Sequence, residues 1–266
     1  MDTPRDDEVR IIYIGGPTVL LTIGSLHLLS DPTFEPTGYR YPSGETEVVK
    51  TTTPALALAT LPAIDAVLLR HDQHKDNLDP AGREYLASAG RVLTTPESAQ
   101  RLGANAEGMA PWQTVTLTAV DGLTVRVTAT PARHGSAAVA PAATGSVTGW
   151  MLEWQGQRKG ALYISGDTVL YEGVEEVARR YTVSAALLHF GAAHVPRLGP
   201  DNLTLTATEG ARLALLMPHA AIFPIHYEGW THLSEGRNAI EQAFANVGIA
   251  ERLRFLLPGR LTTVAI

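Results

Sequence analysis

The stretch from residue 65 to residue 80 runs from an apolar segment into a polar cluster and then into the start of a helix. Residues 65–69 form a short, largely apolar run that stops abruptly at Arg70, which predicts a buried strand. Asp79 followed by Pro80 is the pattern of a helix N-cap with proline at the first helical position. The polar residues between these two signals are therefore predicted to form a tight turn between a strand and a helix.

Two histidines and a carboxylate lie on this predicted turn, at His71, His74 and Asp76. Imidazole nitrogens and a carboxylate held close together suit zinc, iron or manganese, and the chain has no cysteine to supply a thiolate. The alternative is a polar loop whose histidines only cap backbone groups. The pair of histidines alone does not separate these two interpretations.

Three further residues repeat this placement downstream. His134, Asp167 and His226 each follow a strand-like run and begin a loop, although each one alone is also compatible with a capped turn. In its order and spacing the whole set resembles the metallo-β-lactamase superfamily, and within it the branch of ascorbate-6-phosphate lactonase and the phospholipase-D-like hydrolases. The resemblance extends from Ile11 to about Val264.

The resemblance implies a four-layer αββα sandwich with two similar halves, in which two sheets pack face to face and helices cover them. The chain's own pattern agrees, because a first hairpin that closes at Ser30-Asp31 is echoed by a second that closes at Ser165-Gly166-Asp167. With 45% hydrophobic residues, 266 residues can bury a large core. We expect a disordered N-terminal tail over residues 1–8 and a single domain over residues 9–266.

Local signals also predict where later elements lie. Thr206 and Glu209 form the ends of a capping-box pattern that predicts a helix start. Ser234 is expected to open the last long helix. Residues 253–257 and 261–265 are expected to be the final strands.

The resemblance further implies which residues bind metal. In that family the first two histidines of a His-x-His-x-Asp-His motif and a later histidine bind one metal. The motif's Asp, its last His and a final histidine bind a second, and an aspartate bridges both. The positions that match in this chain are His71, His74, Asp76, His134, Asp167 and His226. One or two divalent ions are expected, zinc first, with manganese or iron as alternatives.

The turn departs from the family's motif at two points. It is one residue longer, so that counting forward from the strand places His71 first, whereas a gapless count places Asp72 first. Imidazole is the commoner ligand, which favours His71. Asn77 stands where the family has its last histidine, and a neutral amide is a poorer ligand for zinc-like metals. The two metal positions are therefore expected to be unequal.

The expected activity is metal-dependent hydrolysis of a small-molecule ester, lactone, amide or phosphoester by a metal-bound hydroxide. The catalytic residues are expected to be Asp76, His134 and His226, with Asp76 orienting water and then protonating the leaving group. One alternative is an iron-dependent variant that performs oxygen chemistry. Another is a non-catalytic or regulatory metal-binding protein with a degenerate site.

Several other residues are candidates for contacts with substrate or with the metal ligands. They are Asp72, Asn77, His189, His194, Tyr227 and Trp230, with His232 beside the last of them. Capping is the alternative for the two histidines at 189 and 194, and hydrophobic packing is the alternative for the residues after His226. The segment 33–46, rich in Pro, Gly, Tyr and Thr, is either a substrate lid or a surface insertion.

Composition narrows the classes of partner. The chain has 21 Lys plus Arg against 27 Asp plus Glu, a net charge of −6 and no long basic run, so nucleic acid is not expected. The acidic start Met-Asp-Thr-Pro-Arg-Asp-Asp-Glu is unlike a signal peptide, and no apolar run approaches the roughly 20 residues that span a bilayer. We expect a cytoplasmic protein with a small-molecule substrate and no membrane span. The sequence leaves the oligomeric state open.

Overall fold

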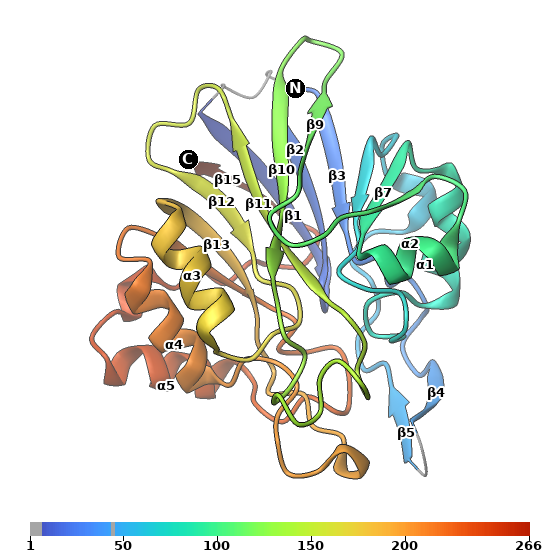
Figure 1. Cartoon of the computed structure of the whole chain (residues 1–266), viewed down its shortest axis with the longest axis vertical. Helices are drawn as coiled ribbons and strands as arrows, with labels where there is room; N and C mark the ends of the chain where they lie inside the picture. The colour runs from blue at the N-terminus through green and yellow to red at the C-terminus, as the bar shows by residue number, and fades with distance from the viewer. Residues whose placement is uncertain (1–6, 44–45) are drawn as a thin grey trace.

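The computed structural model describes residues 7–43 and 46–266. It confirms the αββα sandwich, because two sheets lie face to face and helices cover both outer faces (Figure 1). Residues 1–6 of the expected tail lie outside the described residues. Strand β1 (Glu8–Gly15) already includes the tail's last residue.

The first sheet has seven strands, mixed in direction. Their spatial order is β15 (Leu261–Ala265), β1, β2 (Thr18–Ile23), β3 (Leu26–Ser30), β6 (Ala66–Leu68), β7 (Arg91–Thr94) and β8 (Ala106–Gly108). Helices α1 (Pro80–Tyr85) and α2 (Pro96–Leu102) lie on the outer side of this sheet. A 3₁₀ turn at Leu86–Ser88 continues α1, and the two together account for the helix that the sequence predicts there.

The second sheet has six strands. Their order is β14 (Ala221–Ile225), β13 (Val183–His189), β12 (Ala161–Ile164), β11 (Thr148–Trp154), β10 (Thr124–Pro131) and β9 (Thr114–Thr118). Its outer face carries three helices, α3 (Glu172–Arg180), α4 (Ala207–Leu216) and α5 (Arg237–Asn246). The two halves therefore share a sheet-plus-helices plan, as expected.

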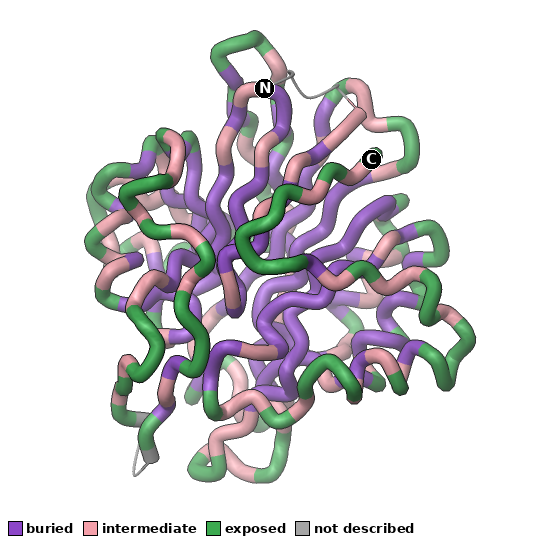
Figure 2. The backbone as a smooth tube through the Cα atoms, turned by 180° about the vertical axis from the view of Figure 1, so that it is seen from behind, coloured by how far each residue is buried: buried purple, intermediate pink, exposed green. Residues whose placement is uncertain are grey.

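The main core lies between the sheets and is made by alternate strand residues. On β10 the side chains of Val125, Val127 and Ala129 are fully buried in this core, together with Ile11 of β1. Alternation follows from the two-residue period of a strand, which turns every second side chain to the same face. Figure 2 shows the buried backbone concentrated in the middle of the molecule.

Two predicted helix caps are confirmed. The Asp79 carboxylate accepts a hydrogen bond from Gly82 N at 2.9 Å and caps α1. Thr206 and Glu209 form the capping box of α4, in which each side chain binds the other residue's backbone N–H. The cap at Asp79 fixes the end of the loop that carries the polar turn.

Two predictions near the C-terminus are wrong. The last helix begins at Arg237 behind the N-cap Gly236, because the Ser234 hydroxyl donates instead to Ala192 O at 2.8 Å. Residues 253–257 form no strand. A 3₁₀ turn at Ala250–Arg252 precedes a single bridge to β14, and Pro258, which has no N–H, ends any further pairing.

The segment 33–46 is more regular than the sequence suggests. Its second half enters a two-stranded hairpin of β4 (Arg40–Ser43) and β5 (Thr46–Val49), in which Tyr41 pairs with Val48. Residues 44–45 lie outside the described residues. The hairpin stands beside the loops at the lower end of the sandwich in Figure 1.

Strand direction brings the predicted ligands together. Strands β12, β13 and β14 are parallel, and β3 is parallel to β6. Parallel strands end at the same edge of a sheet, where α/β proteins commonly bind ligands. Among the described residues, no helix is both long and apolar enough to cross a membrane.

Candidate metal centre

Three imidazole nitrogens converge at this edge. His71 and His74 lie on the loop between β6 and α1, and His134 follows β10. His74 Nδ1 lies 3.0 Å from His71 Nε2 and 3.1 Å from His134 Nε2. Ligands about 2.0–2.1 Å from a tetrahedral zinc ion are about 3.3 Å apart, so this spacing is close to that of a metal site.

The protonation state of these histidines also suits a metal. His134 Nδ1 donates to Leu203 O at 2.8 Å, which leaves the lone pair of its Nε2 turned towards His74. Burial lowers the pKa of His71 well below the ordinary value, the pKa of His74 to about 4, and that of His134 as well. The imidazoles are therefore neutral at pH 7, the form that binds metal.

A second group consists of Asp76, Asp167 and His226, all buried. His226 Nε2 lies 3.2 Å from Asp76 Oδ2, and His226 Nδ1 lies 3.7 Å from Asp167 Oδ1. The other oxygen of Asp167 is 3.8 Å from His134 Nε2 in the first group. Asp167 therefore lies between the two groups, the place that the resemblance implies for a bridging aspartate.

Both carboxylates of the second group are held ionised. Burial alone would raise the pKa of Asp76, but hydrogen bonds from His226 and His232 hold it well below the ordinary value. Burial likewise opposes ionisation of Asp167, whose pKa is nevertheless lowered, chiefly by the charge of Arg70. The two carboxylates are anionic at neutral pH.

Two residues of this region have left-handed backbone conformations. His226 has a φ of 57° and Asp31 a φ of 34°, and neither is glycine. Such conformations cost about 1–3 kcal/mol and persist only where the surroundings enforce them. A hydrogen bond from His226 N to Gly16 O at 2.8 Å is one such constraint. The imidazole of His226 is thus directed towards the carboxylates at an energetic cost.

Sequence reasoning undervalued His232, for which it considered contact with substrate or hydrophobic packing. Its Nε2 lies 2.9 Å from Asp76 Oδ2, the same oxygen that His226 contacts. His232 comes from the loop after β14, six residues beyond the predicted ligand. The sequence feature that could have indicated this role is the presence of a second histidine close to the predicted ligand His226.

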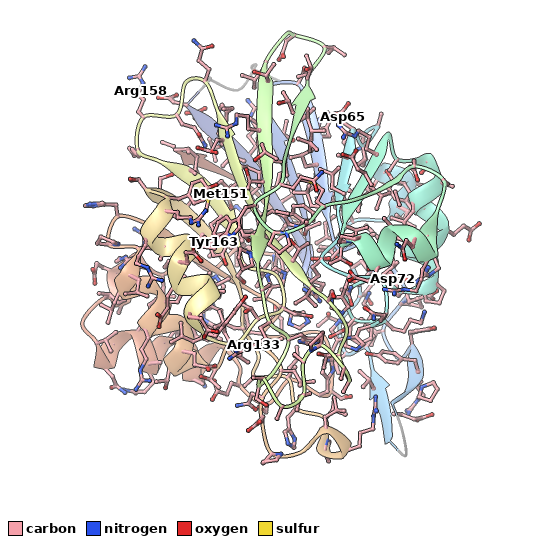
Figure 3. The ribbon with its side chains drawn as sticks, in the orientation of Figure 1. Asp65, Asp72, Arg133, Met151, Arg158 and Tyr163 are labelled. Atoms are coloured by element: carbon pink, nitrogen blue, oxygen red, sulfur yellow. The ribbon has the colours of Figure 1, made fainter. Side chains whose placement is uncertain are left out.

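Asp72 faces away from the two groups, and Asn77 binds the backbone of the turn. Asp72 accepts from Arg101 Nε at 2.9 Å and lies 3.4 Å from Arg83, and Figure 3 places it beside α1 and α2. The geometry therefore favours His71 over Asp72 as the first ligand. The Asn77 amide donates to His71 O, so that its nitrogen serves the backbone of the turn.

The two remaining candidate histidines differ in position. His189 is fully buried at the end of β13, with its Nε2 3.6 Å from Asp31 Oδ2 and its Nδ1 3.3 Å from Ser165 Oγ. It is not a member of either ligand group. His194 is half-buried and donates its backbone N–H to His232 O at 3.0 Å. Its side chain is not among those that line the cavity described below.

The two aromatic candidates pack inside the protein. Tyr227 packs edge-on against Phe255 with ring centroids 5.7 Å apart, in the core under the helices. Trp230 lies edge-on to Tyr41 at 5.9 Å and below the Lys50 ammonium group at 5.3 Å. Trp230 therefore packs against Tyr41. Tyr227 packs in the hydrophobic core, as the alternative interpretation of this residue expected.

A cavity of about 290 Å³ adjoins both ligand groups. His74, His134 and Asp76 line it, and so does Tyr41 of β4. The other described lining residues are Pro42, Val48, Gln73, Lys75, Ala193, Val195, Arg197, Leu198, Leu203 and His232. The walls are largely apolar, with two basic side chains.

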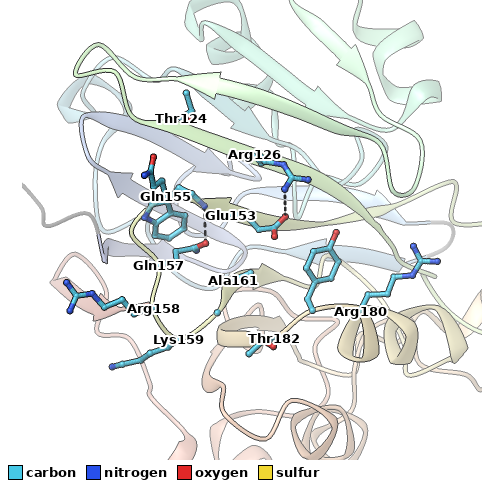
Figure 4. Close-up of a pocket in the computed structure, with 13 residues that line it drawn as sticks. Thr124, Arg126, Glu153, Gln155, Gln157, Arg158, Lys159, Ala161, Arg180 and Thr182 are labelled. Atoms are coloured by element: carbon cyan, nitrogen blue, oxygen red, sulfur yellow. Dashed lines mark hydrogen bonds and ion pairs between the residues drawn. The ribbon is translucent and has the colours of Figure 1, made fainter.

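A larger hollow of about 760 Å³ lies elsewhere, at the starts of β10 and β12 (Figure 4). None of its described lining residues belongs to either ligand group, and Arg126 pairs there with Glu153 at 3.7 Å. In Figure 3, Arg158 from this hollow and Arg133, the neighbour of His134, lie at opposite ends of the strands. The hollow is separate from the candidate metal centre.

Comparison with known proteins gives a family match. A sequence model of the beta-lactamase superfamily domain matches residues 28–227 of the chain. A UPF0173 metal-dependent hydrolase of Pyrococcus abyssi is 24% identical over 201 residues, which cover 74% of this chain and 80% of that protein. A UPF0173 metal-dependent hydrolase of Caldivirga maquilingensis is 24% identical over 213 residues, covering 79% and 85%.

Solved structures share the fold. The isothiocyanate hydrolase from Delia radicum gut bacteria superposes with a TM-score of 0.79 at 20% identity, over 97% of this chain and 100% of that one. A possible metal-dependent hydrolase from Veillonella parvula superposes with a TM-score of 0.76 at 18% identity, over 97% and 99%. At these identities the likeness concerns the fold.

Proposed function

We propose that this protein, which belongs to the beta-lactamase superfamily domain family and is a metal-dependent hydrolase, acts on a small molecule. The bond that it cleaves is an ester, lactone, amide or phosphoester. The observation that supports this most is the convergence of the His71, His74 and His134 nitrogens beside a cavity of about 290 Å³. Neutral imidazole nitrogens this close together fit a divalent cation. We propose zinc, with manganese or iron as alternatives.

A bound divalent cation would supply Lewis acidity, which lowers the pKa of water from 15.7 towards about 7 and polarises a carbonyl or phosphoryl oxygen. The protein side chains orient the reactants. His134 is fixed by Leu203 O, and Asp76 by His226 and His232. These contacts hold the side chains of His134 and Asp76 in fixed directions.

Asp76 is the residue that we propose to transfer the proton. Its Oδ2 contacts both His226 and His232, whereas its Oδ1 is buried with no hydrogen-bond partner among the described residues. Asp76 also lines the cavity. Its Oδ1 is therefore free to orient the attacking water and, because the low pKa of Asp76 makes a captured proton easy to release, to pass the proton of that water to the leaving group.

The cavity limits the substrate by size and polarity. Its volume of about 290 Å³ suits a small molecule. Val48, Leu198 and Leu203 offer apolar contact, while Lys75 and Arg197 offer positive charge at the wall. We propose a substrate with an apolar body whose scissile bond lies next to an oxygen-rich or anionic group.

The test is elemental analysis of purified protein followed by a hydrolysis screen over lactones, phosphodiesters, amides and carboxylic esters. An isothiocyanate is included because a protein with a similar fold hydrolyses one. Metal in the protein and turnover of at least one class, both removed by a chelator, are expected. Redox-active iron with no hydrolysis would favour the oxygen-chemistry alternative, and no tightly bound metal would favour a non-catalytic protein.

Replacing Tyr41 by alanine should raise KM about 10-fold, roughly 1.4 kcal/mol of binding, with little change in metal content. Tyr41 lines the cavity and packs against Trp230, whereas Tyr39 in the same segment is not among the described lining residues. Tyr39→Ala is therefore the matched control. Steady-state kinetics on both variants decide whether the segment contacts substrate, and equal KM values in both would contradict it.

A further inference from the structure

Arg70 is a fully buried arginine beside the ligand groups, with a relative exposure of 0%. Its Nε lies 3.0 Å from Asp167 Oδ2, and its Nη1 lies 3.6 Å from Asp31 Oδ2. Its backbone N–H donates to Asp31 Oδ1 at 2.9 Å. The guanidinium is thus positioned by two carboxylates, those of Asp167 and Asp31.

A buried guanidinium is unusual, because arginine is almost never fully buried unless it is paired. Arg70 directly precedes His71, at the point where β6 leaves the sheet. Its two ion pairs are the contacts that compensate its burial, since none of its side-chain nitrogens makes an aligned hydrogen bond with the described residues. Arg70 therefore contributes a fixed positive charge to the centre.

A single divalent ion already offsets the buried negative charge of the centre. Asp31, Asp76 and Asp167 are buried carboxylates, and Arg70 is the buried cation among them. Burial raises the pKa of Asp31 to about 7, so this carboxyl is only partly ionised at neutral pH. With neutral histidines, the three carboxyl groups and the guanidinium therefore leave a charge between −1 and −2, which one divalent ion offsets. A second divalent ion would leave a buried positive excess, which is costly away from water.

Asn77 gives independent support for an unequal centre. Its amide nitrogen donates to His71 O, which leaves only a neutral amide oxygen, a weaker ligand than imidazole for zinc-like metals, at the position of the family's last histidine. Among the described residues, the strong donors of the second group are then Asp76, Asp167 and His226, with His232 bound to Asp76, and Asp167 is already paired with Arg70. A metal ion in the second group would thus share the Asp167 carboxylate with the Arg70 guanidinium.

We propose that Arg70 is a positioning residue that supplies, at Asp167, the positive charge that a second metal ion supplies in a two-metal centre. The chain then binds one metal tightly, at His71, His74 and His134. This inference rests on the proposed metal-dependent hydrolase function and specifies its metal stoichiometry.

Calorimetric titration of metal-free protein with zinc tests the proposal. The unmodified protein should bind one zinc ion per chain, with any second ion at least 100-fold weaker. Arg70→Gln keeps a polar side chain but removes the charge, and it should tighten the second site to within about 10-fold of the first. Arg70→Lys keeps the charge and should still bind one ion. Arg83→Gln, which removes a half-exposed arginine beside Asp72, should also bind one.

Two equally tight zinc ions in the unmodified protein would overturn the proposal, and so would a folded Arg70→Gln that still binds only one. If Arg70→Gln does not fold, the unmodified protein and Arg70→Lys decide the matter by their stoichiometry. Hydrolysis is measured on the same samples. One tight ion without hydrolysis would contradict the proposed hydrolase function but support the proposed role of Arg70. Two tight ions with hydrolysis would support the hydrolase function but contradict the role of Arg70.

Discussion

Replacing His134 by alanine should lower turnover and zinc affinity, each by at least about 100-fold, because the change removes one of three convergent nitrogens. The effect should be specific to the centre. His134 lies on the loop after β10, and its imidazole contacts Leu203 O and His74 but is not part of the sheet core. Far-ultraviolet circular dichroism should therefore be unchanged. Kinetics and metal analysis on the same preparation measure both losses.

The matched control for this variant is His219→Ala, an exposed histidine in the loop between α4 and β14. It should keep full metal content and full turnover. If His134→Ala behaves like His219→Ala, His134 is not a metal ligand and the first group must be reassigned.

Replacing Gly82 by alanine should destabilise the protein by about 3 kcal/mol, although alanine is ordinarily the better helix residue by about 1 kcal/mol. Gly82 is buried in the first turn of α1, where an added Cβ would collide with the carbonyl group of Pro32. The collision would push α1 away from the loop that follows β3. That loop carries Asp31, so the site would be displaced as well.

Urea denaturation measures this loss, with Gly236→Ala as the control. Gly236 is the N-cap of α5, has a negative φ, and an added Cβ there has no described atom within 4 Å. Its replacement should cost no more than about 1 kcal/mol. Equal unfolding free energies for the two variants would mean that α1 does not pack on Pro32 as closely as the structure shows.

The layers and most elements were predictable from sequence because their signals are local. Alternation on β10, the Asp79 cap and the Thr206 capping box each depend on residues close together in the chain. The positions of the predicted metal ligands could also be predicted, because these residues lie at or just after the ends of strands that point to the same edge of the sandwich. Their roles as ligands stay predictions.

The features that sequence reasoning missed depend on contacts between distant residues. Arg70 is usually an exposed residue type, and only its contacts with Asp31 and Asp167 explain its burial. His232 matters because it meets Asp76, 156 residues away in sequence. The β4–β5 hairpin has few strand-forming residues on its first strand, so its pairing could not be read from propensity.

The most direct measurement follows hydrolysis while metal-free protein is titrated with zinc, using the best substrate of the screen. The account predicts no turnover at the start, a rise in proportion to added zinc, and a plateau at one ion per chain. The same titration of His134→Ala should stay flat at concentrations that saturate the unmodified protein. Hydrolysis by the metal-free protein at the rate of the loaded protein would contradict the account.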